Sequence, residues 1–487
     1  MKSVKCHTTL KTLLCGLIIL SVLLTAVACG TSGETSAETT PTDVTEEVET
    51  QKDLVYDDLE KQKFNRTFAI LTREPMLHQY KAESLGGGLL NDTVYERNST
   101  LSEDFGIEFA LYHVAEGETD TSLKLQATGG LDEYDMYCGN KDDFKSCAIS
   151  GYCYDLALIE SLSLESEWWD QQCYENLTVE DRTYVMTGDI DPESMLISSC
   201  MVFNKKMMNE LQRDVDNLFA LARNGAWTLD VMYEYGQDVT FDLNGDGVMS
   251  HKDDRYNLAC WAADAPFDLF WGAGGRFVSI VDGVPELTYT PEKVSNIYDK
   301  MYDIFVEEGA YFDSSDYWSS YNLFCQGRAM FLNINLSKLD DHGVTDMEDP
   351  YGILPIPKYD TNQKEYMSFV NGYTPLVMVA KTEKDSEFVG TIMEAMARYN
   401  YDNLTPNMFE IATKLQNAQD PDSAEMVDFV VRNRVFDLSY YCSWDISKIV
   451  PQHLAEGKDS IAAALKTQGT RTQRALTTLL NEYAKHD

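Results

Sequence analysis

Apolar side chains along the chain recur at two spacings, which predict strands and helices in alternation. Residues 64–71 mix large apolar and polar side chains and predict a strand. Residues 92–105 carry apolar side chains at helical spacing and end at Gly106, a common helix stop. A second helix is expected at 123–128, and further strands at 107–112 and 135–138. This order predicts a parallel sheet with helices on its faces.

The same alternation resumes in the second part of the chain and predicts a second sheet. Strands are expected at 196–204, 329–332, 351–354 and 376–379. Helices are expected at 205–211, 229–237 and 385–399, and a long C-terminal helix at 461–483, interrupted at Gly469. No repeat with a period of about 20–50 residues is apparent, which disfavours a solenoid.

The N-terminus has the order of a secretory signal. Three lysines precede an apolar run at 13–24, and Ala26-Val27-Ala28-Cys29 follows with small residues at the expected cut. The cysteine in this context resembles that of a bacterial lipobox, so we expect a signal peptide at 1–28 and a lipid on Cys29. An ordinary signal peptide cut nearby is the alternative. Residues 29–53, rich in Thr, Glu and Ser, predict a flexible tether to the membrane.

Composition and charge limit the classes of molecule that the protein can bind. The formal net charge is −41, which repels phosphate backbones and argues against nucleic-acid binding. A hydrophobic content of 44% describes a well-filled globular protein. Beyond the signal peptide and Cys29, eight cysteines remain, and export permits disulfides among them. Buried unpaired thiols are an equal alternative. The eight are Cys138, Cys147, Cys153, Cys173, Cys200, Cys260, Cys325 and Cys442.

Residues 242–253 fit a twelve-residue calcium loop. Calcium prefers six to eight oxygen ligands, and Gly247 stands at the sixth position, where the loop turns sharply. Ser250 at the ninth position could act through water. The last position holds Asp253 instead of the usual Glu, and an acidic turn that binds nothing is the alternative. The expected structural Ca²⁺ ligands are Asp242, Asn244, Asp246, the carbonyl of Val248, and Asp253.

Several separated motifs in a fixed order resemble the extracellular solute-binding proteins of bacterial ABC importers, in the branch of maltose-binding protein. They are Tyr134-Asp135-Met136, Gly151-Tyr152-Cys153-Tyr154-Asp155-Leu156, Trp168-Trp169-Asp170, Gly188-Asp189-Ile190, Val202-Phe203-Asn204-Lys205, Gly225-Ala226-Trp227-Thr228-Leu229-Asp230, Gly327-Arg328-Ala329-Met330-Phe331 and Tyr351-Gly352-Ile353-Leu354-Pro355-Ile356-Pro357-Lys358. Each motif is weak alone, and their shared order over the mature chain carries the resemblance.

The resemblance implies an α/β protein with the two-lobed periplasmic-binding-protein fold (type II). Each lobe would be a mostly parallel sheet flanked by helices, with the ligand in a cleft between the lobes. Carried over to this chain, lobe one takes 54–195 and 366–425, and lobe two takes 196–365 and 426–487. The implied function is non-catalytic capture of a carbohydrate, hinged closure and delivery to ABC permease subunits, by a monomer at the outer face of the membrane.

Sugar recognition uses aromatic faces for the apolar side of the ring and polar side chains for the hydroxyls. The aromatic candidates are Trp169, Trp271, Trp318, Tyr373 and Trp444, and the polar candidates are Asp189, Arg328 and Asn371. For each aromatic residue, ordinary core or surface packing is the alternative.

Two other functions remain open from the sequence. An exported glycan hydrolase needs only two carboxylates, which no sequence motif fixes. The chain contains no Gly-x-Ser-x-Gly and no His-Glu-x-x-His motif, so neither a hydrolase elbow nor a zinc-protease helix is indicated. A sugar-binding protein that serves a sensor kinase would have the same closed form as one that serves an importer.

Overall fold

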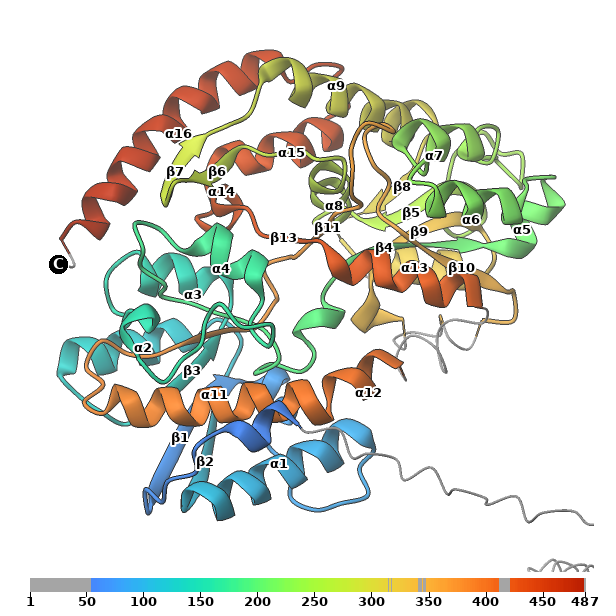
Figure 1. Cartoon of the computed structure of the whole chain (residues 1–487). Coiled ribbons are helices and arrows are strands. Elements are labelled where there is room, and N and C mark those ends of the chain that lie inside the picture. The colour runs from blue at the N-terminus through green and yellow to red at the C-terminus, as the bar shows by residue number, and fades with distance from the viewer. Residues whose placement is uncertain are drawn as a thin grey trace, which may run out of the picture. The chain divides into compact units, whose positions relative to one another are not determined.

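A first sheet is built around β1 (Arg66–Arg73), in the computed structural model of the chain. Its neighbours are β2 (Ile107–Val114) and β3 (Met136–Gly139), both parallel to β1, and β12 (Leu376–Met378), which runs antiparallel to β3. The strand order is β12-β3-β1-β2. The helices against this sheet are α1 (Leu89–Phe105), α2 (Thr119–Gly129) and α11 (Ser386–Asn403), and α1 lies beside α11 (Figure 1).

A second sheet has the order β10-β4-β9-β5-β8. Its strands are β4 (Ser199–Asn204), β5 (Tyr256–Trp261), β8 (Tyr311–Asp313), β9 (Ala329–Asn335) and β10 (Tyr351–Pro355). β5 is parallel to β8 and β9, whereas β4 is antiparallel to β9 and β10. The helices around it include α5 (Lys205–Glu210), α6 (Val215–Arg223), α7 (Leu229–Gly236), α9 (Pro291–Tyr302), α10 (Ser319–Cys325) and α13 (Pro421–Arg432).

Both sheets are mixed but mostly parallel, as expected: only β12 in the first sheet and β4 in the second run against the other strands. The chain passes from one sheet to the other just before β4 and just before β12, at the edge where the parallel strands end. A strand that enters a sheet at that edge must run against its parallel neighbours. The crossings therefore impose the antiparallel pairings of β4 with β9 and of β12 with β3.

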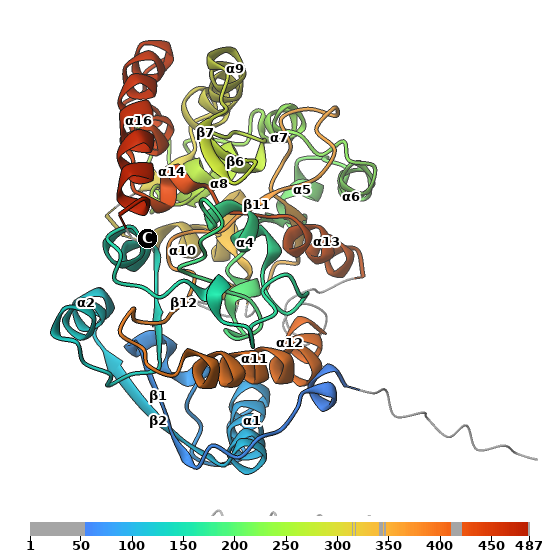
Figure 2. The ribbon, with the colours of Figure 1, turned by 60° about the vertical axis from the view of Figure 1, so that its left-hand side comes forward.

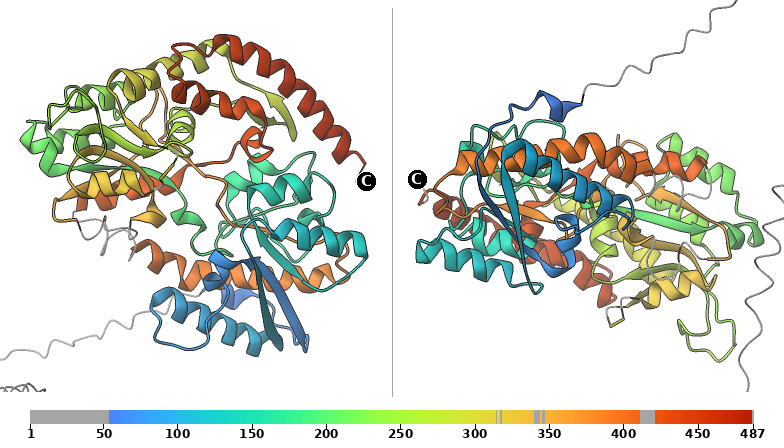
Figure 3. Two further views of the ribbon diagram at one scale, coloured as in Figure 1. Left: turned by 180° about the vertical axis from the view of Figure 1, so that it is seen from behind. Right: turned by 90° about the horizontal axis from the view of Figure 1, so that it is seen from below.

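The segments between the sheets pair with each other. β11 (Ser368–Phe369) is parallel to β13 (Arg434–Val435), and both lie where the two sheets meet (Figure 1). Figure 3 shows the molecule from behind and from below. After β13 the chain forms α14 (Leu438–Tyr441), α15 (Ile449–Ala455) and α16 (Ala462–Tyr483). Figure 2 shows α16 beside α9. The predicted lobe boundary between residues 425 and 426 falls inside α13, which packs on β10.

Gly469 does not interrupt the C-terminal helix, contrary to the prediction. α16 is continuous through this residue, and a Cβ atom at Gly469 would overlap the hydroxyl of Tyr289. That hydroxyl donates a hydrogen bond to the Leu465 carbonyl at 3.1 Å. The glycine is thus explained by close packing rather than by a break in the helix.

The structure describes residues 54–485 except 314, 317, 340–343, 345, 346 and 411–420. The predicted signal peptide, Cys29 and the tether lie outside the described residues. None of the helices within the described ranges combines the length and apolar character needed to cross a bilayer.

Candidate functional site

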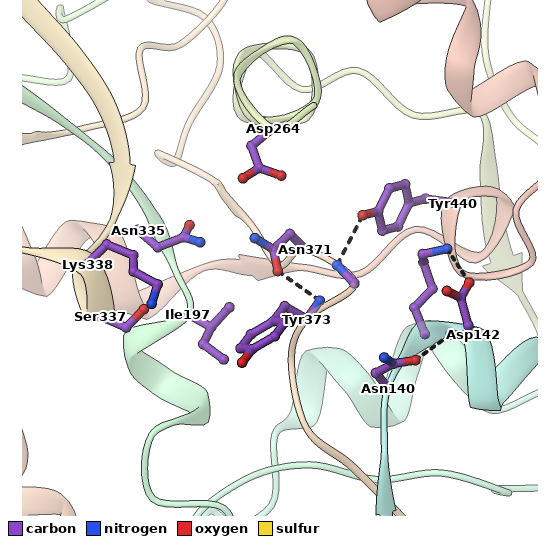
Figure 4. Close-up of a pocket in the computed structure, with 12 residues that line it drawn as sticks. Asn140, Asp142, Ile197, Asp264, Asn335, Ser337, Lys338, Asn371, Tyr373 and Tyr440 are labelled. Carbon is purple, nitrogen blue, oxygen red and sulfur yellow. Dashed lines mark hydrogen bonds and ion pairs between the residues drawn. The ribbon is translucent and has the colours of Figure 1, made fainter. Parts of the chain in front are cut away.

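A pocket of about 500 Å³ lies where the two sheets face each other across the crossing segments (Figure 4). Parallel strands of both sheets end at its wall, which is where open α/β sheets commonly bind ligands. Its lining residues are Asn140, Lys141, Asp142, Ile197, Asp264, Asn335, Ser337, Lys338, Asn371, Gly372, Tyr373 and Tyr440.

Each sheet contributes polar side chains to the pocket at the ends of its strands. Asn140, Lys141 and Asp142 directly follow β3 of the first sheet. On the opposite wall, Asn335 is the last residue of β9, and Asp264 precedes α8 (Ala265–Gly272). A ligand between these walls would contact both sheets.

Tyr373 presents an aromatic face to the pocket from the segment before β12. Its side chain is unusually open, at 39% exposure. The guanidinium of Arg73 lies 4.8 Å from the ring centroid, and its Nη2 donates to the Tyr373 carbonyl at 2.8 Å. The buried cation therefore fixes both the backbone and the ring of Tyr373, while the ring stays accessible.

Hydrogen bonds hold the rest of this segment in place. The Asn371 side-chain oxygen accepts from the Tyr373 N–H at 3.0 Å. The Gly372 N–H donates to the Tyr440 hydroxyl at 3.0 Å, and the Gly372 carbonyl accepts from the Lys141 N–H at 3.2 Å. A Cβ atom at Gly372 would come within 2.7 Å of the Lys141 side chain, so a larger residue here would displace that lysine.

Lys141 and Tyr440 form a second fixed part of the wall. The Lys141 ammonium lies 2.9 Å from an Asp142 carboxylate oxygen and 3.0 Å from the Ser443 hydroxyl. It also stands 5.3 Å from the centroid of the Tyr440 ring. That ring packs edge-on against Phe369 at 4.9 Å. Tyr440 therefore serves as a support for the wall, and Tyr373 offers the more open aromatic face.

Two carboxyl groups at the start of α8 give the opposite wall an unusual electrostatic character. Burial raises the pKa of Asp264 to about 6. Burial, together with the nearby Asp264 charge, raises the pKa of Asp268 well above its usual range. Ser199 and Asn333 stabilise the ionised form of Asp268 through hydrogen bonds. The pocket thus offers carboxyl, amide, hydroxyl and ammonium groups beside one aromatic face, a set suited to a polyhydroxylated ligand.

Of the candidates from the sequence, Asn371 and Tyr373 lie together in this pocket. Trp271 lies in the core beside it, fully buried, and stacks on Phe369 with ring centroids 4.5 Å apart. Phe267 stacks with the same indole at 5.4 Å. Trp271 consequently has no face open to a ligand in this structure.

Trp169 and Asp189 line a different cavity, of about 310 Å³. The Trp169 indole is 1% exposed and donates to a Glu394 carboxylate oxygen at 3.0 Å. Asp189 accepts a hydrogen bond from the Thr405 hydroxyl at 2.6 Å, and burial raises its pKa to about 7. Both side chains have partners within the protein.

The remaining three candidates lie apart from the pocket. Arg328 donates to the carbonyls of His251 at 2.6 Å and Asp254 at 3.1 Å, which ties it to the end of the predicted calcium loop. Trp318 is half-buried and packs edge-on against Tyr321 at 5.1 Å. Trp444 lines a cavity of about 220 Å³ beside α16.

Most of the polar lining residues were not among those predicted from the sequence. Asn140, Lys141 and Asp142 follow a strand predicted at 135–138, and Asn335 lies just beyond one predicted at 329–332. The rule that ligands bind at the carboxyl ends of parallel strands would have selected them. Asp264 and Tyr440 carry no comparable signal, because their place depends on tertiary packing.

Hydrogen bonds from backbone N–H groups to aspartate side chains stabilise the predicted calcium loop. Asp242 accepts hydrogen bonds from the backbone N–H groups of Gly245 at 2.6 Å and Gly247 at 2.7 Å. Asp254 accepts from Leu243 and Ser250 and so holds the two ends of the loop together. In the described part of the chain, no three His, Cys, Asp or Glu side chains are grouped to hold a metal ion.

None of the pocket-lining residues named above is a cysteine. The eight cysteines that the structure describes form no disulfide with one another, and seven are buried. Burial raises the pKa of the Cys138 thiol to about 11 and that of Cys147 to about 12. These thiols pack as small apolar groups.

Similarity to known proteins is found in the structure and not in the sequence. No protein-family model and no curated protein matches the chain. Among solved structures, the GacH receptor of Streptomyces glaucescens, studied unliganded and with acarbose, is 14% identical with a TM-score of 0.53. The alignment covers 85% of this chain and 99% of that protein.

Two further structures are similar in the same way. The maltose/maltodextrin-binding domain MalE of Bdellovibrio bacteriovorus, bound to maltotriose, is 16% identical with a TM-score of 0.51, covering 84% of this chain and 100% of that one. The ABC substrate-binding protein Lmo0181 of Listeria monocytogenes, in complex with cycloalternan, is 14% identical with a TM-score of 0.53, covering 85% and 99%. The chain therefore has the two-lobed type II periplasmic-binding-protein fold that these proteins share, with the first sheet in lobe one and the second in lobe two.

Proposed function

We propose that this protein is an extracellular solute-binding protein that captures a carbohydrate between its lobes and delivers it to an ABC importer. The observation that carries the proposal is the open face of Tyr373, held over Arg73 and surrounded by Asn, Asp and Lys side chains from both sheets. An aromatic face can cover the apolar side of a sugar ring, while the polar groups bond its hydroxyls.

Closure of the lobes follows from the position of the pocket. The pocket is lined by groups of lobe one, such as Asn140, and by groups of lobe two, such as Asn335. A ligand that contacts both walls favours the state in which they are close, and thereby shifts an open–closed equilibrium. The structurally similar proteins bound to maltotriose and cycloalternan support a saccharide as ligand.

The test is direct binding of saccharides to the purified mature protein. Isothermal titration with mono- and oligosaccharides should reveal saturable binding, small-angle scattering should show compaction, and the recovered sugar should be unhydrolysed. Tyr373→Ala should weaken binding at least about tenfold, which corresponds to 1.4 kcal/mol. The control is Tyr112→Ala, because Tyr112 is exposed on β2 and lies outside the pocket.

Two results would count against this function. Saturable binding of a peptide or metal with no response to any saccharide would overturn the ligand class. Conversion of the saccharide to products would favour the hydrolase.

The anchor and the metal belong to the same proposal. A lipid on Cys29 would retain the binding protein at the membrane that holds its permease. A Ca²⁺ ion held by Asp242, Asn244, Asp246, the Val248 carbonyl and Asp253 would stabilise lobe two. The N–H groups of Gly245 and Gly247 on Asp242 already give the loop its turn, which supports this donor set.

A further inference from the structure

The guanidinium of Arg73 lies directly behind the lobe-one wall of the pocket. Arg73 is the last residue of β1 and is 0% exposed. Its Nη1 donates to both carboxylate oxygens of Glu116, at 2.8 and 3.1 Å, and its Nη2 donates to the Tyr373 carbonyl at 2.8 Å. One side chain thus joins the loop after β2 to the segment before β12.

Glu116 carries this connection to a second lining residue. The same Oε1 that accepts from Arg73 also accepts from the Asn140 side-chain amide, at 2.8 Å. The bond orients the Asn140 amide, whose oxygen accepts from the Asp142 N–H at 2.8 Å. Arg73 is therefore connected to two lining residues by two separate routes, which we call its two arms. One is the direct bond to Tyr373, and the other runs through Glu116 to Asn140.

We propose that Arg73 is a positioning residue that holds Tyr373 and Asn140 in their binding positions before the ligand arrives. Lobe one would then offer a preformed half of the sugar site. This inference rests on the proposed function. Preformed groups bind more tightly because less side-chain freedom is lost on binding. The lobe-two groups would then complete the site on closure.

Only an arginine can perform this task at this position. The guanidinium presents a planar fork of donors, which can bond a carboxylate on one side and a carbonyl on the other. A lysine would keep the charge, but its single ammonium group cannot reproduce the planar two-sided contact. The cation also lies under the Tyr373 ring, at 4.8 Å from its centroid.

The nearby carboxyl of Asp191 does not compete for this cation at neutral pH. Asp191 is fully buried, and burial raises its pKa to about 8 even though Arg73 opposes the shift. It is therefore mostly protonated at pH 7. Glu116, with a side chain 43% exposed, supplies the carboxylate in contact with Arg73.

The first experiment compares Arg73→Lys with the wild type by titration of the best saccharide and by thermal unfolding. We expect the Kd to rise about tenfold or more, with only a small change in melting temperature, because charge and bulk are retained. Crystal structures without ligand give a readout that does not depend on sugar binding. They should show Tyr373 and Asn140 displaced or in several conformers in Arg73→Lys.

A double-mutant cycle separates the two arms. Glu116→Gln keeps an acceptor oxygen for Arg73 and removes the charge, so thermal unfolding of this variant is measured beside its affinity. If Glu116 acts through Asn140, the losses of affinity in Glu116→Gln and Asn140→Ala should not add. Glu118→Gln, on the same exposed turn, is the matched control.

The outcomes distinguish this inference from the function on which it rests. A wild type that binds no saccharide overturns the function, and the ligand-free crystal structures still decide whether Arg73 orders the wall. Unchanged affinity and unchanged Tyr373 and Asn140 conformations in Arg73→Lys would overturn the positioning role. Strictly additive losses in the cycle would overturn the Glu116–Asn140 arm.

Discussion

Asp191 is a carboxyl group placed where water cannot reach it. The side chain is 0% exposed, the Tyr80 hydroxyl donates to one oxygen, and the Cys138 thiol lies 3.7 Å from the same oxygen. Burial disfavours the charged form and raises its pKa to about 8, against 3.8 in the unfolded chain. The folded state therefore binds a proton here that the unfolded state releases.

This linkage predicts how stability depends on pH at Asp191. Because the folded pKa is raised, the stabilising effect is complete below about pH 4 and is lost as the pH rises towards about 8. Asp191→Asn should remove this dependence. Between pH 5 and pH 8.5, the free energy of unfolding should fall less in the variant than in the wild type, by on the order of 1–3 kcal/mol.

Urea unfolding at the two pH values measures the difference. Asp58→Asn, which alters an exposed aspartate, is the control and should follow the wild type. Parallel pH profiles of Asp191→Asn and wild type would show that Asp191 is ionised in the folded protein.

The exposure of single aromatic side chains could not be predicted from the sequence. Tyr373 and Trp271 were equal candidates as stacking rings, because composition and neighbouring glycines do not reveal exposure. The structure buries Trp271 behind Phe369 and leaves Tyr373 at 39% exposure. Phe267 and Phe369 cover the Trp271 indole, whereas Arg73, far away in the sequence on β1, bonds the Tyr373 carbonyl.

At the scale of elements, the contact between α16 and Tyr289 gives a sharp prediction. Gly469→Ala should destabilise the protein by about 1–3 kcal/mol, because the added methyl group overlaps the Tyr289 hydroxyl. In a Tyr289→Phe background the hydroxyl is gone, so the same substitution should cost much less and can gain helix propensity. Chemical denaturation of the four proteins provides the measurement. An equal cost of Gly469→Ala in both backgrounds would contradict the steric explanation.

The calcium loop gives a second prediction at this scale. If the loop holds Ca²⁺, the ion stabilises the folded state by about 2.7 kcal/mol at a concentration 100 times its Kd. Chelation or Asp246→Ala should then lower the melting temperature by several degrees, and chelator should not lower that of the variant further. Lys252→Ala, at a non-ligating position of the loop, should behave as wild type. A melting temperature that ignores chelator in all three proteins would argue against a bound ion.

Most elements were predictable because their signals are local. The strand predicted at 107–112 corresponds to β2, and the helix predicted at 92–105 corresponds to α1 with the same C-terminus at Phe105. The direction of β4 and β12 was not predictable in this way. It depends on where the chain crosses between sheets, which no local pattern contains.

At the scale of the whole molecule, the lipid anchor is the prediction to test. With Cys29 diacylated, the wild type should stay in the membrane fraction until detergent is added. Cys29→Ser should lose this retention and appear among the released proteins. Cys15→Ser, inside the apolar run, is the matched control and should remain membrane-bound. Equal retention of the Cys29→Ser protein would show that the membrane association has another cause.

The two-lobed fold was predictable from the order of motifs along the chain, whereas the content of the pocket was only partly so. Asn371 and Tyr373 were identified because they lie in a Gly-containing segment that resembles a crossing segment. Asp264 and Asn335 come from distant parts of the sequence and meet Asn140 only after both sheets have formed.

The late position of β12 in the sequence has a consequence for biogenesis. The strands of the second sheet all lie between Ser199 and Pro355, whereas β3 pairs with β12, where Cys138 meets Val377. If the protein is exported N-terminus first, as proposed above, β3 has an unpaired edge until residues 376–378 leave the channel. Such long-range pairing is slow, and an open edge can pair with other chains. The first sheet, which begins nearest the N-terminus, should thus be completed after the second sheet, and a chaperone would be needed most during that interval.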